Sequence, residues 1–341
     1  MKFGPVSVER AEGKILGHNV AAPDGSRAFR KGRPLTADDV AALRRMRRNV
    51  VYVAELEPGD VDENTAAARV ARAAHGERLR HSEAAAGRVN LLATARGVLR
   101  VAVERLAAVN ACEGVTVATL PSHTAVESGQ AVATVKIIPF AVREETLREV
   151  ERIAGEGEAL LRVDGLPPRS VGLILTGAAS VRERVLRDFD PPVRARVEGL
   201  GSSVHLVEFV TLEDESGEAA LAEALRRQTG AGIDLIVLAG ETAIVDCNDL
   251  APRAIEAAGG EVICFGAPVD PGNLLLLGYL GEVAVLGAPG CARSRKVNVV
   301  DWMLPRLLAG DRLRRADVVA LGHGGLLEDV PERPMPRSKL T

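Results

Sequence analysis

Four short segments combine the residue types that bind phosphate groups, and each follows a run of apolar residues with the length of a β-strand. They are Thr176-Gly177, residues 240–249, residues 267–273 and residues 287–292. Glycine lets backbone N–H groups approach an anion closely, and a helix that begins after such a segment favours negative charge. A single glycine after a strand is usually only a turn, but three of the segments converge after strand ends, with residues 267–273 as a fourth between a strand and a hairpin, and together they predict a site for a small molecule that carries a phosphate group.

Acidic residues lie in the same segments, at Glu241, Asp246, Asp249 and Asp270. Carboxylates repel a phosphate unless a cation lies between them, and Mg²⁺ is held by one or two carboxylates together with ligand oxygens. Asp246 and Asp249 are therefore candidates for a Mg²⁺ site and for catalysis. The alternatives are that Asp249 caps the following helix and that Asp246 is solvated. Glu241 has no such structural role, since it replaces a small residue in a turn.

Several common classes of site are excluded by missing motifs. The chain has no Walker sequence and no Gly-x-Gly-x-x-Gly fingerprint, so the ordinary nucleotide-binding classes are not supported. The four cysteines are scattered without a Cys-x-x-Cys pair, which argues against a zinc cage. Such thiols, in a chain without a secretory signal, suit a reducing cytoplasm.

The composition is that of an ordinary globular protein. The 341 residues are 47% hydrophobic and 26% charged, and this length predicts two or three domains. A net charge of −3 argues against a general nucleic-acid binder, and an aromatic content of 3% argues against base-stacking platforms. No apolar stretch is long enough to span a membrane. We therefore expect a cytoplasmic protein with neither a nucleic-acid nor a membrane partner.

Strand and helix patterns alternate from residue 165 onward, and they must position the four segments. Strands are expected over residues 171–176, 203–210, 233–239 and 261–265, a hairpin over 273–286, and helices over 181–189, 217–229, 249–258 and 296–308. This alternation predicts a three-layer α/β/α domain over residues 165–312 with a mainly parallel sheet. Ligands bind such sheets beyond the carboxyl ends of the strands, where the four segments lie.

The preceding 160 residues have a different pattern. Residues 1–80 are expected to form a mixed α/β segment, in which Thr36 and Asp39 begin a helix with a capping box. Residues 81–160 contain short β-type runs that predict a small β-barrel or sheet, followed by a linking helix over 144–155. The charged and proline-rich residues 313–341 are expected to form an extended tail.

The order and spacing of the C-terminal motifs resemble the molybdopterin-binding domain of the molybdopterin molybdenumtransferases of molybdenum-cofactor biosynthesis. Members of that family carry Thr-Gly-Asp-Glu, Gly-Gly-x-Ser/Thr-x-Gly-x-x-Asp, Pro-Gly-Lys-Pro and Gly-Leu-Pro-Gly-Asn-Pro. The corresponding sequences here begin at Thr176, Ala239, Pro271 and Gly287. Residues 11–23 and 31–40 are similar to the family's N-terminal region in outline.

The resemblance implies a pterin ligand, with Asp246 or Asp249 holding Mg²⁺. It implies that this ligand is bound by Thr176, Gly177, Gly240, Glu241, Thr242, Pro271, Gly272, Asn273, Pro289, Gly290 and Cys291. A homo-oligomer and a molybdoenzyme or cofactor-maturation partner are also expected.

The chain departs from the family pattern at charged positions. Ala178 and Ala179 replace the acidic pair, Glu241 replaces a glycine, and Asn273 replaces the lysine. These changes favour a protein that binds molybdopterin or molybdenum cofactor for biosynthesis, carriage or maturation. The alternative is an active Mg²⁺-dependent transferase that inserts molybdate, and a third possibility is a scaffold without a ligand.

Cys291 replaces the family's asparagine and is expected near the start of the closing helix. A thiolate at a helix N-terminus has a lowered pKa and could ligate a soft metal; the alternative is an idle thiol. Arg293, Arg295 and Lys296 follow, and in the first helical turns they would replace the missing lysine or form a solvated face.

Overall fold

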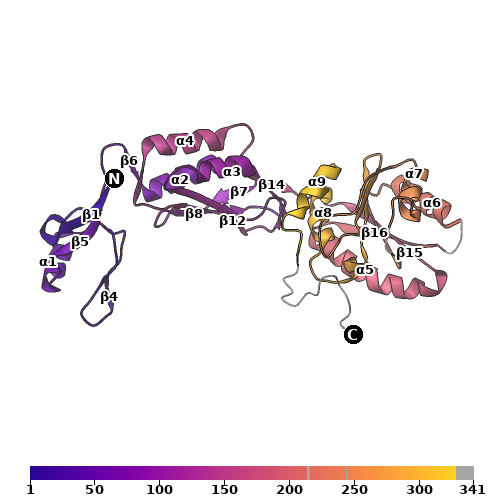
Figure 1. Cartoon of the computed structure of the whole chain (residues 1–341), viewed down its shortest axis with the longest axis horizontal. Helices are drawn as coiled ribbons and strands as arrows, with labels where there is room; N and C mark the ends of the chain where they lie inside the picture. Colours follow the sequence, from indigo (N-terminus) through magenta and orange to yellow (C-terminus); the bar gives the residue numbers. More distant parts are fainter. Residues whose placement is uncertain (213–215, 243, 328–341) are drawn as a thin grey trace. The chain divides into compact units, whose positions relative to one another are not determined.

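The computed structural model describes residues 1–212, 216–242 and 244–327 (Figure 1). It consists of two compact units, Met1–Asp164 and Gly165–Thr341. Within the described ranges, no helix is long and apolar enough to cross a membrane.

The second unit contains a six-stranded, mainly parallel sheet. Its strands lie in the order β16 (Ser203–Thr211), β15 (Ser170–Gly177), β17 (Leu235–Gly240), β20 (Val283–Gly287), β19 (Leu276–Leu280) and β18 (Glu261–Phe265). The first four strands are parallel, and β19 runs antiparallel to both of its neighbours. The predicted α/β fold class is therefore confirmed.

Helices cover both faces of this sheet. One apolar core joins Leu173 and Leu175 to α5 (Arg182–Gly199) and α8 (Val299–Leu308). The other core joins Ile174 to α6 (Ser216–Gly230) and α7 (Leu250–Ala257). Because alternate residues of β15 are buried on opposite faces, the strand has the continuous apolar sequence that buried parallel strands show.

Two helices differ from the predicted ranges. The prediction ended the first helix at residue 189, before Pro191-Pro192, but α5 continues to Gly199 because Val193 and Val197 are fully buried against the sheet. The closing helix begins at Val299 rather than at residue 296, since Asn298 and Asp301 form its capping box.

The segment expected to be extended also contains helical structure. Residues Arg315–Val319 form α9 and Ala320–Gly322 form a 3₁₀ turn, because Asp317 caps the helix and Val318 is buried. Residues 328–341 of the predicted tail lie outside the described residues.

The first unit begins with a small sheet in the order β1 (Lys2–Ser7), β5 (Val50–Glu55) and β2 (Ile15–Leu16). Helix α1 (Ala37–Arg45) packs on it through a core that includes Leu43. The predicted capping box of Thr36 and Asp39 is present. The short strands β3 (Val20–Ala21) and β4 (Arg27–Phe29) pair with each other beside this sheet.

The remainder of the first unit is a four-stranded sheet covered by helices. The strands are β10 (Val115–Thr119), β12 (Ala131–Ile137), β8 (Arg88–Ala93) and β7 (Leu79–His81), and the helices are α2 (Glu63–Ala74), α3 (Val103–Asn110) and α4 (Glu144–Gly155). Two further sheets have the strand orders β11 (Ala125–Val126), β9 (Gly97–Val101), β14 (Leu161–Gly165) and β13 (Ala141–Arg143), β6 (Asp60–Asp62). Residues 66–74 share the core of this sheet, although the sequence placed them in the preceding segment.

Candidate functional site

The structure brings the four predicted segments to one edge of the six-stranded sheet. Thr176 is paired with Gly240, and Leu238 is paired with Gly287, so β15, β17 and β20 end side by side. The segment that follows β18 leads to Leu276, which is paired with Gly287 at the same edge. This placement is the one that ligand-binding α/β sheets require.

The ends of β15 and β17 pack too closely to hold a ligand between them. Thr176 is buried, and its Oγ1 lies 3.4 Å from the carbonyl oxygen of Ala239. A Cβ atom on Gly240 would lie 2.1 Å from the Thr176 Oγ1. Glycine at position 240 is therefore required by packing alone, and it is not by itself a sign of a ligand.

Glu241 makes contacts at this edge that the sequence did not reveal. Its Oε1 accepts a hydrogen bond of 2.6 Å from Nη2 of Arg184, and its Oε2 lies 3.4 Å from the backbone nitrogen of Ala178. Ala178 immediately precedes the 3₁₀ turn Ala179–Val181 that leads into α5. The carboxylate thus occupies donors that an anionic ligand would otherwise use.

Asp249 is the N-cap of α7, which confirms the structural alternative for this residue. Its Oδ1 accepts a hydrogen bond of 2.8 Å from the backbone of Leu250, and its Oδ2 accepts one of 3.1 Å from the backbone of Val245. Satisfying the first turn of a helix in this way stabilises it by about 1 kcal/mol. The residue therefore has a role in the fold whether or not a metal binds.

Asp246 is exposed in the same loop and holds it in a local turn. Its Oδ1 accepts hydrogen bonds from the backbone nitrogen of Asn248 at 2.8 Å and from the side-chain amide of Asn248 at 2.9 Å. These hydrogen bonds hold the pKa of Asp246 below its usual value, so the carboxylate is charged at neutral pH. Thr242, also predicted to bind the ligand, is exposed nearby.

The acidic residues do not form a preformed metal cage. Among the described residues, no group of three or more His, Cys, Asp or Glu side chains is placed to hold a metal ion. Both oxygens of Asp249 already accept backbone hydrogen bonds. Mg²⁺ does not fit these side chains as a resident ion.

The other two segments meet at the start of α8. The backbone nitrogen of Val299 lies 3.2 Å from the carbonyl oxygen of Pro271, and Nδ2 of Asn298 lies 3.4 Å from the carbonyl oxygen of Cys291. Gly272 has a φ of +138°, and a Cβ there would lie 2.4 Å from Cγ1 of Val299. Packing therefore accounts for the glycine of this segment as well.

Two predicted ligand residues, Asn273 and Gly290, offer more accessible groups. Asn273, in the position of the family's lysine, is exposed, while its carbonyl oxygen accepts a hydrogen bond of 2.9 Å from Ala267. A Cβ on Gly290 would meet only the guanidinium of Arg293, at 3.7 Å. Pro289, in contrast, is buried.

Cys291 does not lie at the N-terminus of the closing helix, so that prediction was wrong. It lies in a 3₁₀ turn over Gly290–Arg293, and α8 begins only at Val299. Arg295 and Lys296 accordingly precede the helix instead of forming its first turns. Cys291 is partly buried.

The sequence also missed Arg196, which holds the segment between this turn and α8. Its side chain is only 8% exposed, and the guanidinium donates to the carbonyl oxygens of Ala292, Ser294 and Lys296 at distances of 2.7–3.1 Å. Its Nε donates to Oδ1 of Asp301 at 2.9 Å. Since these partners lie about 100 residues further along the chain, no local pattern could have identified them.

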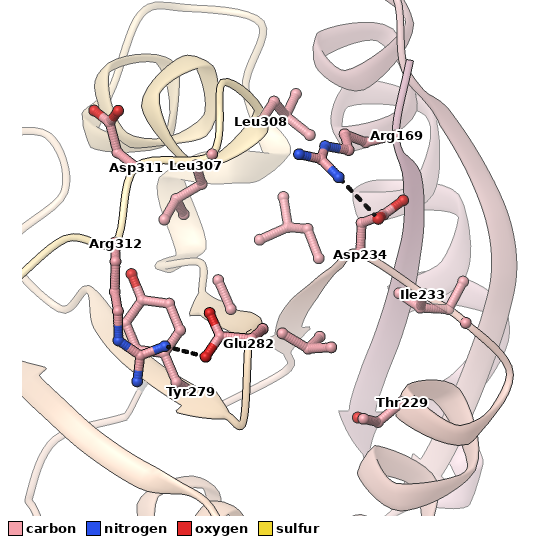
Figure 2. A pocket seen from close by; sticks show the side chains of 15 residues that line it. Arg169, Thr229, Ile233, Asp234, Tyr279, Glu282, Leu307, Leu308, Asp311 and Arg312 are labelled. Atoms are coloured by element: carbon pink, nitrogen blue, oxygen red, sulfur yellow. Dashed lines mark hydrogen bonds and ion pairs between the residues drawn. The ribbon is translucent and has the colours of Figure 1, made fainter. Parts of the chain in front are cut away.

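A cavity of about 430 Å³ lies at the opposite edge of the sheet (Figure 2). It is lined by Arg169, Asp234 and Val283, at the amino ends of β15, β17 and β20, and by residues of the loop after α8. Nη1 of Arg169 lies 3.2 Å from Oδ1 of Asp234, and the guanidinium of Arg312 lies over the ring of Tyr279. None of these residues belongs to the segments predicted to bind the ligand.

Comparisons with known proteins give one sequence match and several structural ones. Residues 5–55 match a domain of unknown function (DUF8806). No curated protein matches the chain.

The solved structures that resemble this chain do so at low identity. A molybdenum cofactor biosynthesis protein from Pyrococcus furiosus is 14% identical over 94% of this chain and 65% of its own length, with a TM-score of 0.24. The chain therefore spans slightly less than two thirds of that protein. The molybdopterin biosynthesis Mog protein from Mycobacterium ulcerans is 16% identical over 40% of this chain and 91% of its own length, with a TM-score of 0.28. A structure of MogA is 18% identical over 40% of this chain and 92% of its own length, with a TM-score of 0.25.

Proposed function

We propose that this chain binds molybdopterin or the molybdenum cofactor at the carboxyl edge of its six-stranded sheet. The proposal is based on the observation that four separate segments, each resembling a family motif, lie at this one edge. The protein would then serve cofactor biosynthesis, carriage or the maturation of a molybdoenzyme. The proposal includes a cytoplasmic location, a homo-oligomer and a partner in cofactor maturation.

The exposed residues of this edge match the chemistry of such a ligand. A bound pterin brings a flat heterocycle with hydrogen-bonding edges and a tail that ends in phosphate. The Thr242 hydroxyl and the Asn273 amide are exposed hydrogen-bonding groups, and Arg293 is an exposed cation at the same edge. Charged donors form stronger hydrogen bonds to phosphate than neutral donors do.

Glu241 sets a condition on how a phosphate would bind. Its carboxylate already pairs with Arg184 and lies beside the Ala178 nitrogen, so an incoming anion meets a negative charge at these donors. The phosphate must therefore bind toward Asn273 and Arg293, or displace Glu241. This feature favours binding and carriage over catalysis.

A Mg²⁺-dependent transferase is the second candidate function. The observation in its favour is that Asp246 is exposed, charged at neutral pH and located in the loop that follows β17. Because the side chains form no cage, Mg²⁺ would have to bind together with the phosphate of the ligand.

The test is to purify the protein from a host that makes the cofactor and to measure pterin fluorescence after oxidation. We expect pterin in the wild type and about tenfold less in Asn273→Asp, which places a negative charge where the phosphate binds; that loss corresponds to about 1.4 kcal/mol. Asn49→Asp, at an exposed site in the first unit, is the matched control. Absence of pterin in the wild type would reject the proposal in favour of a scaffold.

Conversion of the bound pterin into active molybdenum cofactor distinguishes the two candidate functions. Molybdate and Mg²⁺ are added to the pterin-loaded protein, and active cofactor is assayed. Formation of cofactor that is lost in Asp246→Ala would support the transferase. Retention of pterin without conversion would support carriage.

A further inference from the structure

The N-terminal sheet carries an exposed cluster of rings. Phe3 and Tyr52 are 48% and 46% exposed, although Phe, Tyr and Trp together make up only 3% of the chain. Their centroids are 6.1 Å apart, and the ring of His18 lies 5.6 Å from Phe3 and 5.2 Å from Tyr52. The ring planes of Phe3 and His18 are inclined by 81°, and those of Phe3 and Tyr52 by 36°, so the three rings form a tilted, edge-to-face cluster.

The sheet and a glycine position these rings. In β5, Val51 and Val53 are buried in the core, so Tyr52 between them lies on the opposite, outer face. The backbone nitrogen of Gly17 lies 2.7 Å from the carbonyl oxygen of Tyr52, and a Cβ at position 17 would lie 2.6 Å from Cε2 of Phe3. The absence of a side chain at Gly17 therefore makes room for the Phe3 ring.

A hollow of about 320 Å³ adjoins the rings. His18, Tyr52, Asn19, Val50 and Arg48 are among the residues that line it. Arg48 is exposed, and its Nη2 lies 3.3 Å from the carbonyl oxygen of Ala21, which leaves other guanidinium donors facing solvent. The hollow therefore combines the rings of His18 and Tyr52 with the positive charge of Arg48.

The surrounding segment is strongly basic. Residues 1–56 contain eleven Lys and Arg against six Asp and Glu, a net charge of +5, whereas the whole chain has a net charge of −3. The whole-chain charge and aromatic content that argue against nucleic-acid binding conceal this local surplus. Polyanions are attracted to a segment with a surplus of positive charge, and the attraction weakens with added salt.

We propose that the Phe3–His18–Tyr52 surface binds single-stranded nucleic acid, with unpaired bases stacked on the rings of Tyr52 and Phe3 and a phosphate bound by Arg48. Unpaired bases stack on aromatic side chains without regard to sequence, whereas a run of Asp and Glu presents carboxylates but no aromatic face to these rings. This proposal uses only residues of the first unit and does not depend on pterin binding.

The test is fluorescence anisotropy of the full chain with labelled oligouridine and labelled oligothymidine at several salt concentrations. We expect binding that weakens with salt, a loss of affinity of roughly 5- to 150-fold in Tyr52→Ala, and near wild-type affinity in Tyr52→Phe, which keeps the ring. Arg48→Gln should reduce the slope of log affinity against log salt by about 0.7. Comparing the two oligonucleotides distinguishes RNA from DNA as the ligand.

Controls make the result decisive. Phe3→Ala provides a second ring-loss variant, and Val103→Ala removes another exposed apolar side chain far along the chain. Circular dichroism confirms that each variant is folded. The proposal is overturned if neither oligonucleotide binds, or if binding is unchanged in both ring-loss variants. Binding of polyglutamate in place of the oligonucleotides would overturn it in favour of an acidic protein partner.

Discussion

The carboxylate of Glu241 and the guanidinium of Arg184 are joined by a hydrogen bond of 2.6 Å at the carboxyl edge of the six-stranded sheet. The two residues come from the loop after β17 and from α5, 57 positions apart in the sequence. Their side chains are 30% and 51% exposed, so the pair adds at most about 1 kcal/mol to stability. Its larger consequence is for ligands, because it neutralises a cation at the edge where a phosphate is proposed to bind.

Glu241→Gln should therefore strengthen anion binding with little effect on stability. The amide removes the negative charge, and we expect affinity for inorganic pyrophosphate to rise about fivefold, the effect of one like charge about 4 Å away in water. Isothermal titration calorimetry measures the change. Glu208→Gln is the matched control, since Glu208 pairs with Arg227 at nearly the same exposures, 30% and 53%. An equal effect in both variants would show only a change in overall charge.

Arg196→Met should loosen the segment that leads from Cys291 to α8. The substitution removes the hydrogen bonds to three carbonyl oxygens and the contact with Asp301. Hydrogen bonds to charged groups contribute about 1.5–3 kcal/mol each and are not additive within one network, so we expect the free energy of unfolding to fall by at least about 2–3 kcal/mol. Hydrogen exchange should rise over residues 292–299. Arg187→Met, an exposed change on the same helix, should leave both measurements unchanged.

The sheet, and the placement of the four segments at one of its edges, could be predicted because the information is local. Apolar runs of strand length predicted all the strands of the second unit, and the rule for parallel sheets placed their carboxyl ends together. The start of a helix could also be predicted where the sequence contains a recognisable capping box, as at Thr36. The prediction for the closing helix did not include the Asn298 cap, and it therefore began three residues too early.

The parts that could not be predicted depend on contacts between distant residues. The helix α5 passes through Pro191 because buried valines hold the following turns on the sheet. Gly240 and Gly272 resembled phosphate-binding glycines, but each faces an atom that leaves no room for a side chain. A structural role for Glu241 could not be inferred from the sequence, because its partner Arg184 lies 57 positions away.

Gln228→Met should stabilise the protein. Gln228 is 1% exposed on α6, and neither Nε2 nor Oε1 has a hydrogen-bond partner among the described residues. An unsatisfied buried polar group costs about 1–3 kcal/mol, and methionine has a similar length without the amide. We expect the free energy of unfolding to rise by about 1 kcal/mol in chemical denaturation. Gln228→Glu should lower it, since an unpaired charge would be buried; a gain in both variants would contradict the explanation.

A bound pterin should protect Cys247 and Cys291 from alkylation. Both thiols lie in segments at the carboxyl edge of the sheet, Cys247 exposed and Cys291 partly buried, so a ligand there would shield them. Cys264 is buried, which raises the pKa of its thiol, and it should react slowly with or without ligand. Mass spectrometry after a brief iodoacetamide pulse gives the extent of modification at each cysteine, before and after the pterin is removed.

Cys112 in the first unit is the internal control, because its partly buried thiol lies outside the proposed site. Equal protection of Cys112 would indicate a general stabilisation, whereas no protection of Cys247 would place the pterin away from the loop after β17.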